Sequence, residues 1–392
     1  MLVKEKVNQA KGILKEFGVD CWLTFVRESG ITPDPSLAFL AASDVTWHSA
    51  FIITASGETR AIVGQYDKQT IADLGAYDEV VAYVQSIKEP FLSYLKQLNP
   101  GKIAVNFSKG SEIADGLTHG MYLILRDLLA EIGMQDQLIS SEKIVSALRQ
   151  RKTAAELERM KGAIRFTEKV FDEVAGFIKP GRSEKEIAAF MINLMKQAGL
   201  VSAWDVNMCP AVFTGPDTAG AHYGPTDRKV EMGHVLNMDF GVKYQDYCSD
   251  MQRTFYILQD GETEAPPEVK KGFETILNSI ESARKALKPG VQGHEVDAVA
   301  RNIIVNAGYE EFPHGLGHQV GRFAHDGTAL LGPRWEKYAN KPFEKIEEGM
   351  VFTIEPRLTV PGRGVVTIEE MVVVTKSGAE YLSHPQTELI LI

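Results

Sequence analysis

Two short stretches, GHVLNMDF at residues 233–240 and GMVFTIEP at residues 349–356, share one pattern. In each stretch a glycine precedes an acidic residue by six positions: Gly233 precedes Asp239, and Gly349 precedes Glu355. The alternation of side chains leading to each acid is typical of a β-strand, in which every second residue lies on the same face of a sheet. The pattern therefore predicts two related strands, each with a carboxylate at its end.

A second acid follows each of these strands. Asp250 follows Asp239 after the turn-like sequence YQDY, and Glu369 follows Glu355 after the turn-like sequence PGRG. Each spacing predicts a pair of strands with both carboxylates directed inward. The sequence thus predicts four acids at equivalent places in two related parts of the chain.

Three of the nine histidines lie close together in PHGLGHQVGRFAHDG, residues 313–327. They are His314, His318 and His325. A helix over this segment is disfavoured, because each of the glycines beside His318 and His314 would cost about 1 kcal/mol in a helix interior. We therefore expect an extended or looped segment.

The sequence surrounding these motifs repeats itself. KPG at 179–181 recurs at 288–290, and AG at 198–199 recurs at 307–308, in both cases 109 residues later. Each copy predicts a helix that ends before KPG and a second helix that ends at the glycine of AG. Two copies are too few for a solenoid, so we expect two related halves packed face to face, with their acids near a shared axis.

Four carboxylates in one cleft would repel one another and would be costly to remove from water unless they were protonated or neutralised by cations. A pair of divalent metal ions resolves this conflict. Oxygen donors with one imidazole suit Mn²⁺, Co²⁺, Fe²⁺ or Zn²⁺. Two such ions about 3.5 Å apart activate water and stabilise a tetrahedral intermediate, so hydrolysis is the predicted class of reaction.

These residues, set in MDFG, CSDMQRTF, HGLGHQVG, TIEP and TIEEMVVVT, resemble the pita-bread metallopeptidases, which include aminopeptidase P, prolidase and methionine aminopeptidase. The resemblance implies an α+β fold: a creatinase-like N-terminal α/β domain at 1–145, followed by a pseudo-twofold pita-bread catalytic domain at 150–392. It also implies hydrolysis of the peptide bond between an N-terminal residue and proline, as by an Xaa-Pro aminopeptidase or dipeptidase.

The same resemblance assigns roles to individual residues. Glu355 is expected to act as acid and base as well as ligand. His222 is expected to handle the leaving amine, and His314 and His325 are expected to contact the substrate carbonyl and the tetrahedral intermediate. Arg253 and Thr254 are expected to support the site. The expected ligands of two divalent ions, with Mn²⁺ foremost, are Asp239, Asp250, His318, Glu355 and Glu369.

The sequence departs from the proline-specific members of this family at one place. They usually carry an arginine two residues before the last glutamate, where this chain has Thr367. The arginine nearest to Thr367 in the sequence, Arg363, lies on the predicted turn. This departure leaves open a second hypothesis, a hydrolase acting on a non-peptide C–N or related bond. A metal-free binding module that uses the same cleft is the third.

Each residue also has an ordinary structural interpretation. A strand-end acid is more often a cap, a turn residue or part of an exposed strand face, and a single histidine more often packs in a core or lies on a loop. Arg253 could form a plain ion pair with a neighbouring carboxylate, and Thr254 could reflect β-propensity alone. The combination of the repeat with the order and spacing of all five ligands favours the dinuclear site.

Composition limits the classes of partner and the location. The chain has 392 residues, which predicts two or three domains. With 42 basic and 52 acidic residues the net charge is −10, which argues against nucleic-acid binding. Three dispersed cysteines, a first helix unlike a signal peptide and the lack of an 18-residue apolar run predict a cytoplasmic protein that spans no membrane. A short peptide substrate and a homodimer follow from the resemblance.

The first 145 residues alternate helical and strand signals without a motif that indicates chemistry. Strands are expected at CWLTF (21–25), AFIITA (50–55) and KIAVNF (102–107). After residue 151 the apolar residues recur with helical spacing, and Thr153 with Glu156 has the spacing of a capping box. We therefore expect a helix to begin a second domain there.

Overall fold

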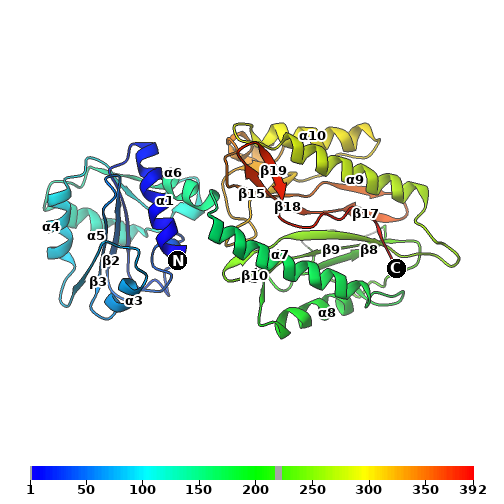
Figure 1. The fold of residues 1–392 in the computed structure, drawn as a ribbon, viewed down its shortest axis with the longest axis horizontal. Helices are drawn as coiled ribbons and strands as arrows, with labels where there is room; N and C mark the ends of the chain where they lie inside the picture. The colour runs from blue at the N-terminus through cyan, green and yellow to red at the C-terminus, as the bar shows by residue number, and fades with distance from the viewer. Residues whose placement is uncertain (1, 217–222) are drawn as a thin grey trace. The chain divides into compact units, whose positions relative to one another are not determined.

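The computed structural model describes residues 2–216 and 223–392. The chain divides into two compact units, Met1–Arg149 and Gln150–Ile392. Figure 1 shows that each unit contains its own sheet structure flanked by helices. Among the described residues, no helix combines the length and apolar character needed to cross a lipid bilayer.

The first unit is a six-stranded sheet covered by helices on both faces. The strand order is β4-β3-β2-β1-β5-β6. The strands are β1 (Cys21–Val26), β2 (Ser49–Thr54), β3 (Thr59–Gly64), β4 (Glu79–Tyr83), β5 (Ile103–Val105) and β6 (Leu138–Ser140). The helices are α1 (Leu2–Phe17), α2 (Leu37–Leu40), α3 (Lys68–Asp73), α4 (Lys88–Leu98), the 3₁₀ turn η1 (Glu112–Ala114), α5 (His119–Ala130) and α6 (Glu142–Gln150).

Alternation along the central strands builds two cores in this unit. Trp22 of β1 packs in a cluster with Val7 of α1, whereas its neighbour Leu23 packs in another cluster with Phe91 of α4. Successive side chains of a strand point to opposite faces, so one apolar strand supplies both cores. The three expected strands are present as β1, β2 and a shortened β5.

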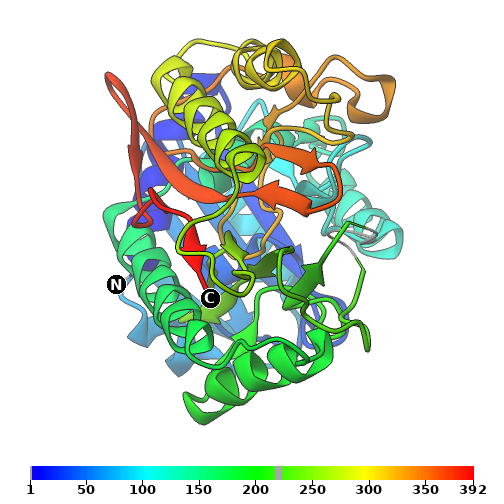
Figure 2. The same ribbon diagram turned by 90° about the vertical axis from the view of Figure 1, so that its right-hand side faces the viewer.

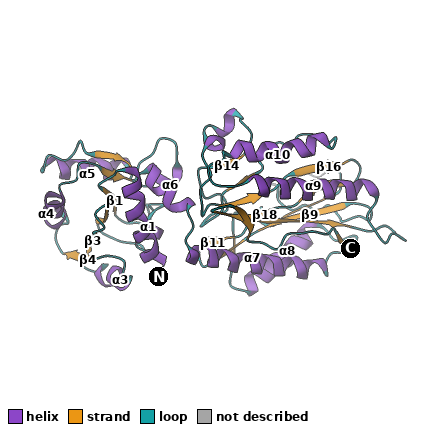
Figure 3. Ribbon diagram, turned by 45° about the horizontal axis from the view of Figure 1, so that its top comes forward, coloured by secondary structure: helices purple, strands orange, loops and turns teal. Residues whose placement is uncertain are grey.

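The second unit places several small sheets between two pairs of helices. Figures 1 and 3 show α7 and α8 on one side of the strands and α9 and α10 on the other. The helices are α7 (Ala154–Ala175), α8 (Glu184–Gln197), α9 (Pro267–Ala286), α10 (Gly293–Asn306) and the 3₁₀ turns η2 (Glu336–Tyr338) and η3 (Lys341–Phe343).

The strands of the second unit form the sheets β11-β10-β7, β20-β12-β9-β8, β13-β14, β15-β18-β19 and β16-β17. The C-terminal strand β20 lies parallel to β12, and Figure 2 shows it at the end of the chain. The first group is β7 (Val201–Ser202), β8 (Ala211–Thr214), β9 (Val235–Phe240), β10 (Val242–Tyr244), β11 (Tyr247–Cys248) and β12 (Met251–Tyr256). The second is β13 (Gly317–His318), β14 (Leu330–Leu331), β15 (Val351–Ile354), β16 (Arg357–Val360), β17 (Gly364–Thr367), β18 (Glu370–Thr375), β19 (Gly378–Tyr381) and β20 (Ile390–Leu391).

The predicted repeat appears in the backbone. Helix α10 begins and ends 109 residues after the corresponding ends of α8, and each helix has a capping box at its N-terminus. The glycine of each KPG motif has a positive φ, 87° at Gly181 and 92° at Gly290, which favours glycine over other residues. Their amides donate to the carbonyls of Val230 and Ile346, at 2.8 and 2.9 Å. The two halves of this unit therefore share one local scaffold.

Both predicted strand pairs are present, and each encloses an additional hairpin: β10–β11 lies between β9 and β12, and β16–β17, with its turn at PGRG, lies between β15 and β18. Strands β9 and β12 pair antiparallel, as do β15 and β18. We expected only a turn at YQDY between β9 and β12. Instead β10 and β11 form a hairpin there, with Gln245 and Asp246 in the left-handed region at φ of 46° and 69°. Strand β10 also pairs with β7, an association between distant segments that local spacing does not reveal.

The expected helix start and the cysteines agree with the structure. Helix α7 begins after Thr153, whose side chain accepts from the amide of Glu156 while the Glu156 carboxylate accepts from the amide of Thr153. All three cysteines are buried free thiols. Burial raises the pKa of Cys21 to about 12, so this thiol is protonated and unreactive at neutral pH.

Candidate active site

The first half of the second unit supplies two acids on neighbouring strands. Asp239 lies on β9, directly opposite Gln252 of β12, and Asp250 immediately precedes β12. The antiparallel pairing brings the two aspartates together although the β10–β11 hairpin separates them in sequence. The side chain of Asp250 is buried, with 7% of its surface exposed.

The second half supplies two glutamates in equivalent places. Glu355 immediately follows β15, and its amide donates to the carbonyl of Leu316 at 2.7 Å. Glu369 lies between β17 and β18. Its backbone bridges to Gln252 of the first half: the Glu369 amide donates to the Gln252 carbonyl at 3.2 Å. This bridge joins the two halves at the carboxylates.

His318 lies among these acids. It is in β13, as part of the extended segment expected from the glycines beside it. Its Nε2 is 3.7 Å from Asp250 Oδ2, 3.5 Å from Glu355 Oε1 and 3.9 Å from Glu369 Oε1. Ligand atoms of His318, Asp250 and Glu369 all lie within 4.8 Å of one another, as a shared cation requires.

Burial and like charge both oppose ionisation of this cluster. Burial raises the pKa of Asp239 to about 7. Burial, followed by the charges of neighbouring carboxylates, raises the pKa values of Asp250, Glu355 and Glu369 well above their ordinary range. Without cations, the four groups cannot all be ionised at neutral pH.

Two buried oxygens in the cluster lack a hydrogen bond. They are Asp239 Oδ1 and Glu369 Oε2, for which the described residues provide no partner. A buried acceptor without a partner costs free energy, so these atoms are suited to bind a cation or a donor from outside the chain. The donor set of carboxylate oxygens and one imidazole also fits divalent metal ions.

Gln252 connects the halves through its side chain as well. Its Nε2 donates to Glu355 Oε2 at 3.3 Å, and its Oε1 accepts from the hydroxyl of Thr367 at 3.2 Å. The hydroxyl therefore orients the amide so that its donor faces Glu355. The sequence analysis did not identify Gln252. Its position two residues after Asp250, which places both side chains on one face of a strand, could have indicated it.

Arg253 and Thr254 lie behind the cluster. Arg253 forms a buried ion pair with Glu370 at 3.0 Å and donates to the carbonyl of Glu369 at 3.2 Å. Thr254 donates to the carbonyl of Thr367 at 2.6 Å. Both residues thus fix the backbone on either side of Glu369. The ion-pair interpretation of Arg253 holds, and that pair is also part of the support of the site.

The other expected histidines lie on the segment that follows α10. His314 is half-buried, and its Nδ1 lies 2.8 Å from the carbonyl of Gly315. His325 is exposed, and its ring meets that of His318 edge-on with 4.1 Å between centroids. The structure therefore places His325 beside the carboxylate cluster. His222 lies outside the described residues.

Arg357 is a further charged residue near the cluster that the sequence interpretation did not consider. It is two residues beyond Glu355 and directly opposite Thr367 in the β16–β17 ladder. The side chain is half-buried, and burial lowers the pKa of its guanidinium from the ordinary value. Its equivalent in the first half is Gly241, two residues beyond Asp239, and comparison of the repeats would have drawn attention to it.

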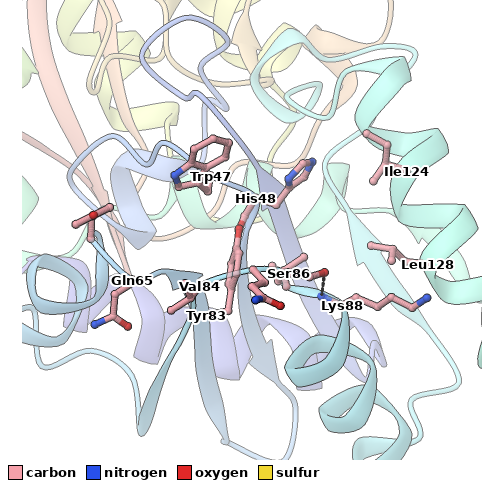
Figure 4. A pocket seen from close by; sticks show the side chains of 12 residues that line it. Trp47, His48, Gln65, Tyr83, Val84, Ser86, Lys88, Ile124 and Leu128 are labelled. Carbon is pink, nitrogen blue, oxygen red and sulfur yellow. Dashed lines mark hydrogen bonds between the residues drawn. The ribbon is translucent and has the colours of Figure 1, made fainter.

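A cavity of about 570 Å³ in the first unit differs in chemistry from the carboxylate cluster. Figure 4 shows Trp47, His48, Tyr83 and Lys88 around it, together with apolar side chains such as Leu128. None of its lining residues is acidic. A divalent cation would find neither negative charge nor carboxylate oxygen there, so this cavity is not a candidate metal centre.

Comparison with known proteins agrees with the geometry. The family described as metallopeptidase family M24 matches residues 158–376. An uncharacterized peptidase of Staphylococcus aureus is 32% identical over 263 residues, which cover 64% of this chain and 70% of that protein.

Two solved structures resemble the chain over almost its whole length. An Xaa-Pro dipeptidase from Bacillus anthracis is 25% identical with a TM-score of 0.74, and the match covers 100% of both chains. An X-Pro aminopeptidase from Thermotoga maritima is 26% identical with a TM-score of 0.74, and the match covers 97% of this chain and 100% of that one. These matches confirm the predicted pita-bread fold and, together with the family match, show that the chain belongs to metallopeptidase family M24.

Proposed function

We propose that this chain is a dinuclear Xaa-Pro metallopeptidase that hydrolyses the peptide bond between an N-terminal residue and proline. The observation that carries the proposal is the convergence of acids from both halves on His318 Nε2, at 3.5–3.9 Å from three carboxylates. The likeness to an Xaa-Pro dipeptidase and an X-Pro aminopeptidase supports the choice of substrate.

We assign the two divalent ions to five ligands. Asp239, Asp250 and Glu369, together with His318 and Glu355, would hold the two ions between the halves. When bound, the ions would supply Lewis acidity and compensate four negative charges. Among candidate metals we favour Mn²⁺, with Co²⁺, Fe²⁺ and Zn²⁺ as alternatives, because four of the five ligands offer oxygen.

The chain's own groups would move the protons. Glu355 would take the proton of the attacking water and return it to the leaving nitrogen, and Gln252 would hold one of its oxygens in place. His314 and His325 would bind the substrate carbonyl and the developing negative charge, and His222 would assist the departing amine. The position of His325 beside His318 supports its part in this assignment.

The direct test uses purified protein loaded with Mn²⁺ or Co²⁺ and an alanyl-proline dipeptide. The proposal predicts release of free proline, which ceases when a chelator removes the metal and returns when the metal is restored. Absence of turnover on every Xaa-Pro peptide tested, by protein that binds two ions, would overturn the substrate and favour a non-peptide bond. Absence of bound metal after growth in metal-rich medium would instead favour a binding module.

The non-peptide hypothesis arose because Thr367 stands where proline-specific members carry an arginine. The structure makes this reason weaker. Arg357 stands opposite Thr367 on the paired strand, so the region does not lack a guanidinium. A Thr367→Arg variant distinguishes the cases: a gain of proline-peptide hydrolysis would indicate that the natural chain acts on another bond. We also extend to this chain the creatinase-like N-terminal domain, the homodimer and the cytoplasmic location, which remain predictions from the resemblance.

A further inference from the structure

The strand pair β16–β17 contains an arginine whose charge is not compensated. Among the described residues, Arg357 has no ion pair and no side-chain hydrogen bond, although it is half-buried. Burying a charge without a partner is costly, and a chain tolerates it most readily where a ligand supplies the opposite charge. The other arginine of this hairpin, Arg363, is already paired with Glu268 at 2.9 Å.

The register places Arg357 on the same face of the hairpin as Thr367, which contacts the cluster through Gln252. Residues directly opposite in an antiparallel ladder project from the same face with Cβ atoms about 5 Å apart. Opposite Arg357 is Thr367, whose hydroxyl contacts Gln252, and Gln252 in turn contacts Glu355. The stem of Arg357 therefore leaves the sheet on the face that carries the cluster.

The first half shows that this position is not constrained to be basic by the scaffold. Its equivalent, Gly241, has no space for a side chain, because an added Cβ would lie 2.1 Å from the carbonyl oxygen of Ser249. The second half has room at Arg357 and fills it with a long cation. The difference is that a glycine stands two residues beyond Asp239 in the first half, whereas a guanidinium stands two residues beyond the proposed base, Glu355, in the second.

The charge balance of the site defines the ligand. Two divalent ions would neutralise four ionised carboxylates, so an additional anion entering the site needs a cation of its own. An Xaa-Pro dipeptide brings such an anion, its C-terminal carboxylate, about one residue or 3.8 Å beyond the scissile bond. Arg357 is two residues from Glu355 along an extended chain, at most about 7 Å away, and its side chain spans the remaining gap.

We propose that Arg357 is a specificity-determining residue that binds the free C-terminal carboxylate of a dipeptide, so that the enzyme is a dipeptidase rather than an aminopeptidase for longer chains. The proposal rests on the proposed Xaa-Pro function. A guanidinium suits this task because its planar donors match the two oxygens of a carboxylate. A longer peptide presents a neutral amide at the same place and lacks that interaction.

The test compares alanyl-proline with alanyl-prolinamide, which differ only in the terminal charge. For wild-type enzyme we expect kcat/KM to be about 100-fold higher for the acid. Arg357→Met should raise KM for the acid about 100-fold with kcat within about threefold, and should change neither constant for the amide by more than about threefold. Arg357→Lys should recover part of the loss, because it keeps the charge without the planar pair of donors.

Arg363→Met is the matched control, because it removes a nearby guanidinium that is already paired. It should leave the ratio of acid to amide unchanged. Equal losses on acid and amide in the Arg357→Met and Arg357→Lys enzymes would overturn the proposal, as would no loss on either. Thermal unfolding of both variants establishes that they are folded.

A binding measurement separates this proposal from the proposed function. Calorimetry of the metal-loaded protein with proline and prolinamide requires no turnover. Wild type should bind proline more tightly, and Arg357→Met should lose that preference while Arg363→Met keeps it. If wild type hydrolyses neither dipeptide but shows the Arg357-dependent preference, the peptidase function fails and the carboxylate site stands. If proline and prolinamide bind equally to wild type, the carboxylate site is refuted even if peptides are hydrolysed.

Discussion

In the first half of the second unit, β9 carries Asp239 and the chain continues through Gly241; in the second half, β15 leads to Glu355 and the chain continues through Arg357. The supporting backbone is alike, since α8 and α10 are related by a constant 109 residues. The side chains that face the cluster are not. The turns and helix caps recur because both halves must form the same backbone structure. The proposed reaction, in contrast, needs only one base and only one residue that binds the end of the substrate.

The halves also differ in the imidazole. His318 belongs to the segment after α10. Among the residues that the structure describes, the first half contributes carboxylates to the cluster but no histidine. The bridge between Gln252 and Glu369 then joins the unequal halves into one site. The repeat thus provides the backbone that surrounds the cluster in both halves. The residues that differ between the halves are the ones to which we assign separate roles in the reaction.

The largest expected effect comes from Glu355→Gln, which removes the base from the second half. We expect kcat for alanyl-proline to fall 10²- to 10⁴-fold, the usual contribution of general acid–base catalysis. Steady-state kinetics with metal content measured in parallel provides the check. Glu380→Gln on the exposed face of β19 is the control and should retain full activity. A loss of kcat below tenfold for Glu355→Gln would show that the base does not belong to the second half.

The next effect concerns the negative charge of the carboxylates that both halves contribute, and how it changes stability with pH. The pKa of Asp239 is about 7 in the folded chain and about 4 when unfolded, so the folded state binds more protons between these values. The stability of the metal-free protein should therefore fall as pH rises from about 4 to about 7. Metal ions need the ionised form, so added Mn²⁺ should stabilise the protein more at pH 7.5 than at pH 5. At 100 times the Kd that holds at pH 7.5, one bound ion should contribute about 2.7 kcal/mol.

Thermal unfolding with and without Mn²⁺ across this pH range measures both trends. Asp239→Asn is the matched control, because it removes the titrating group and should reduce the pH dependence of the metal-free protein. Equal stabilisation by Mn²⁺ at both pH values would contradict the coupling between the cations and the carboxylates.

A smaller effect distinguishes the two equivalent positions directly. Gly241→Ala should lower the free energy of unfolding by about 1–3 kcal/mol, because the new Cβ meets Ser249 and Trp204. Arg357→Ala should change it by less than about 1 kcal/mol, because no ion pair or side-chain hydrogen bond is lost. Denaturant unfolding of both variants supplies the comparison, and similar costs at the two positions would mean that the scaffold, and not the ligand, selects Arg357.

The smallest effect tests the connection between the halves. Gln252→Leu should lower kcat about tenfold, because Glu355 loses the donor that orients it. Thr367→Val should lower kcat only about two- to threefold, because it removes the hydroxyl that orients Gln252 but leaves the amide. Metal content should stay at two ions in both variants. A larger loss for Thr367→Val than for Gln252→Leu would contradict this order of action.

Local sequence patterns predicted much of this arrangement. The capping box at Thr153, the glycines of the KPG motifs and the strands leading to Asp239 and Glu355 depend on neighbours a few residues away. Local rules do not extend to the pairing of β10 with β7, because the two strands are some forty residues apart in the sequence. The positions of Gln252 and Arg357, two residues beyond Asp250 and Glu355, mark them as candidates in the sequence, but their contacts depend on which strand lies opposite.

The sequence by itself determined the set of acids and histidines, the repeat that relates them and the helices and strands that carry them. It did so because residue spacing fixes the face of a strand and the ends of a helix. Tertiary structure alone decided which groups meet: the register of β16 and β17 sets Arg357 opposite Thr367, and the bridge at Glu369 brings Gln252 to Glu355. Pairing between distant strands depends on the packing of the whole unit, which no short stretch of sequence contains.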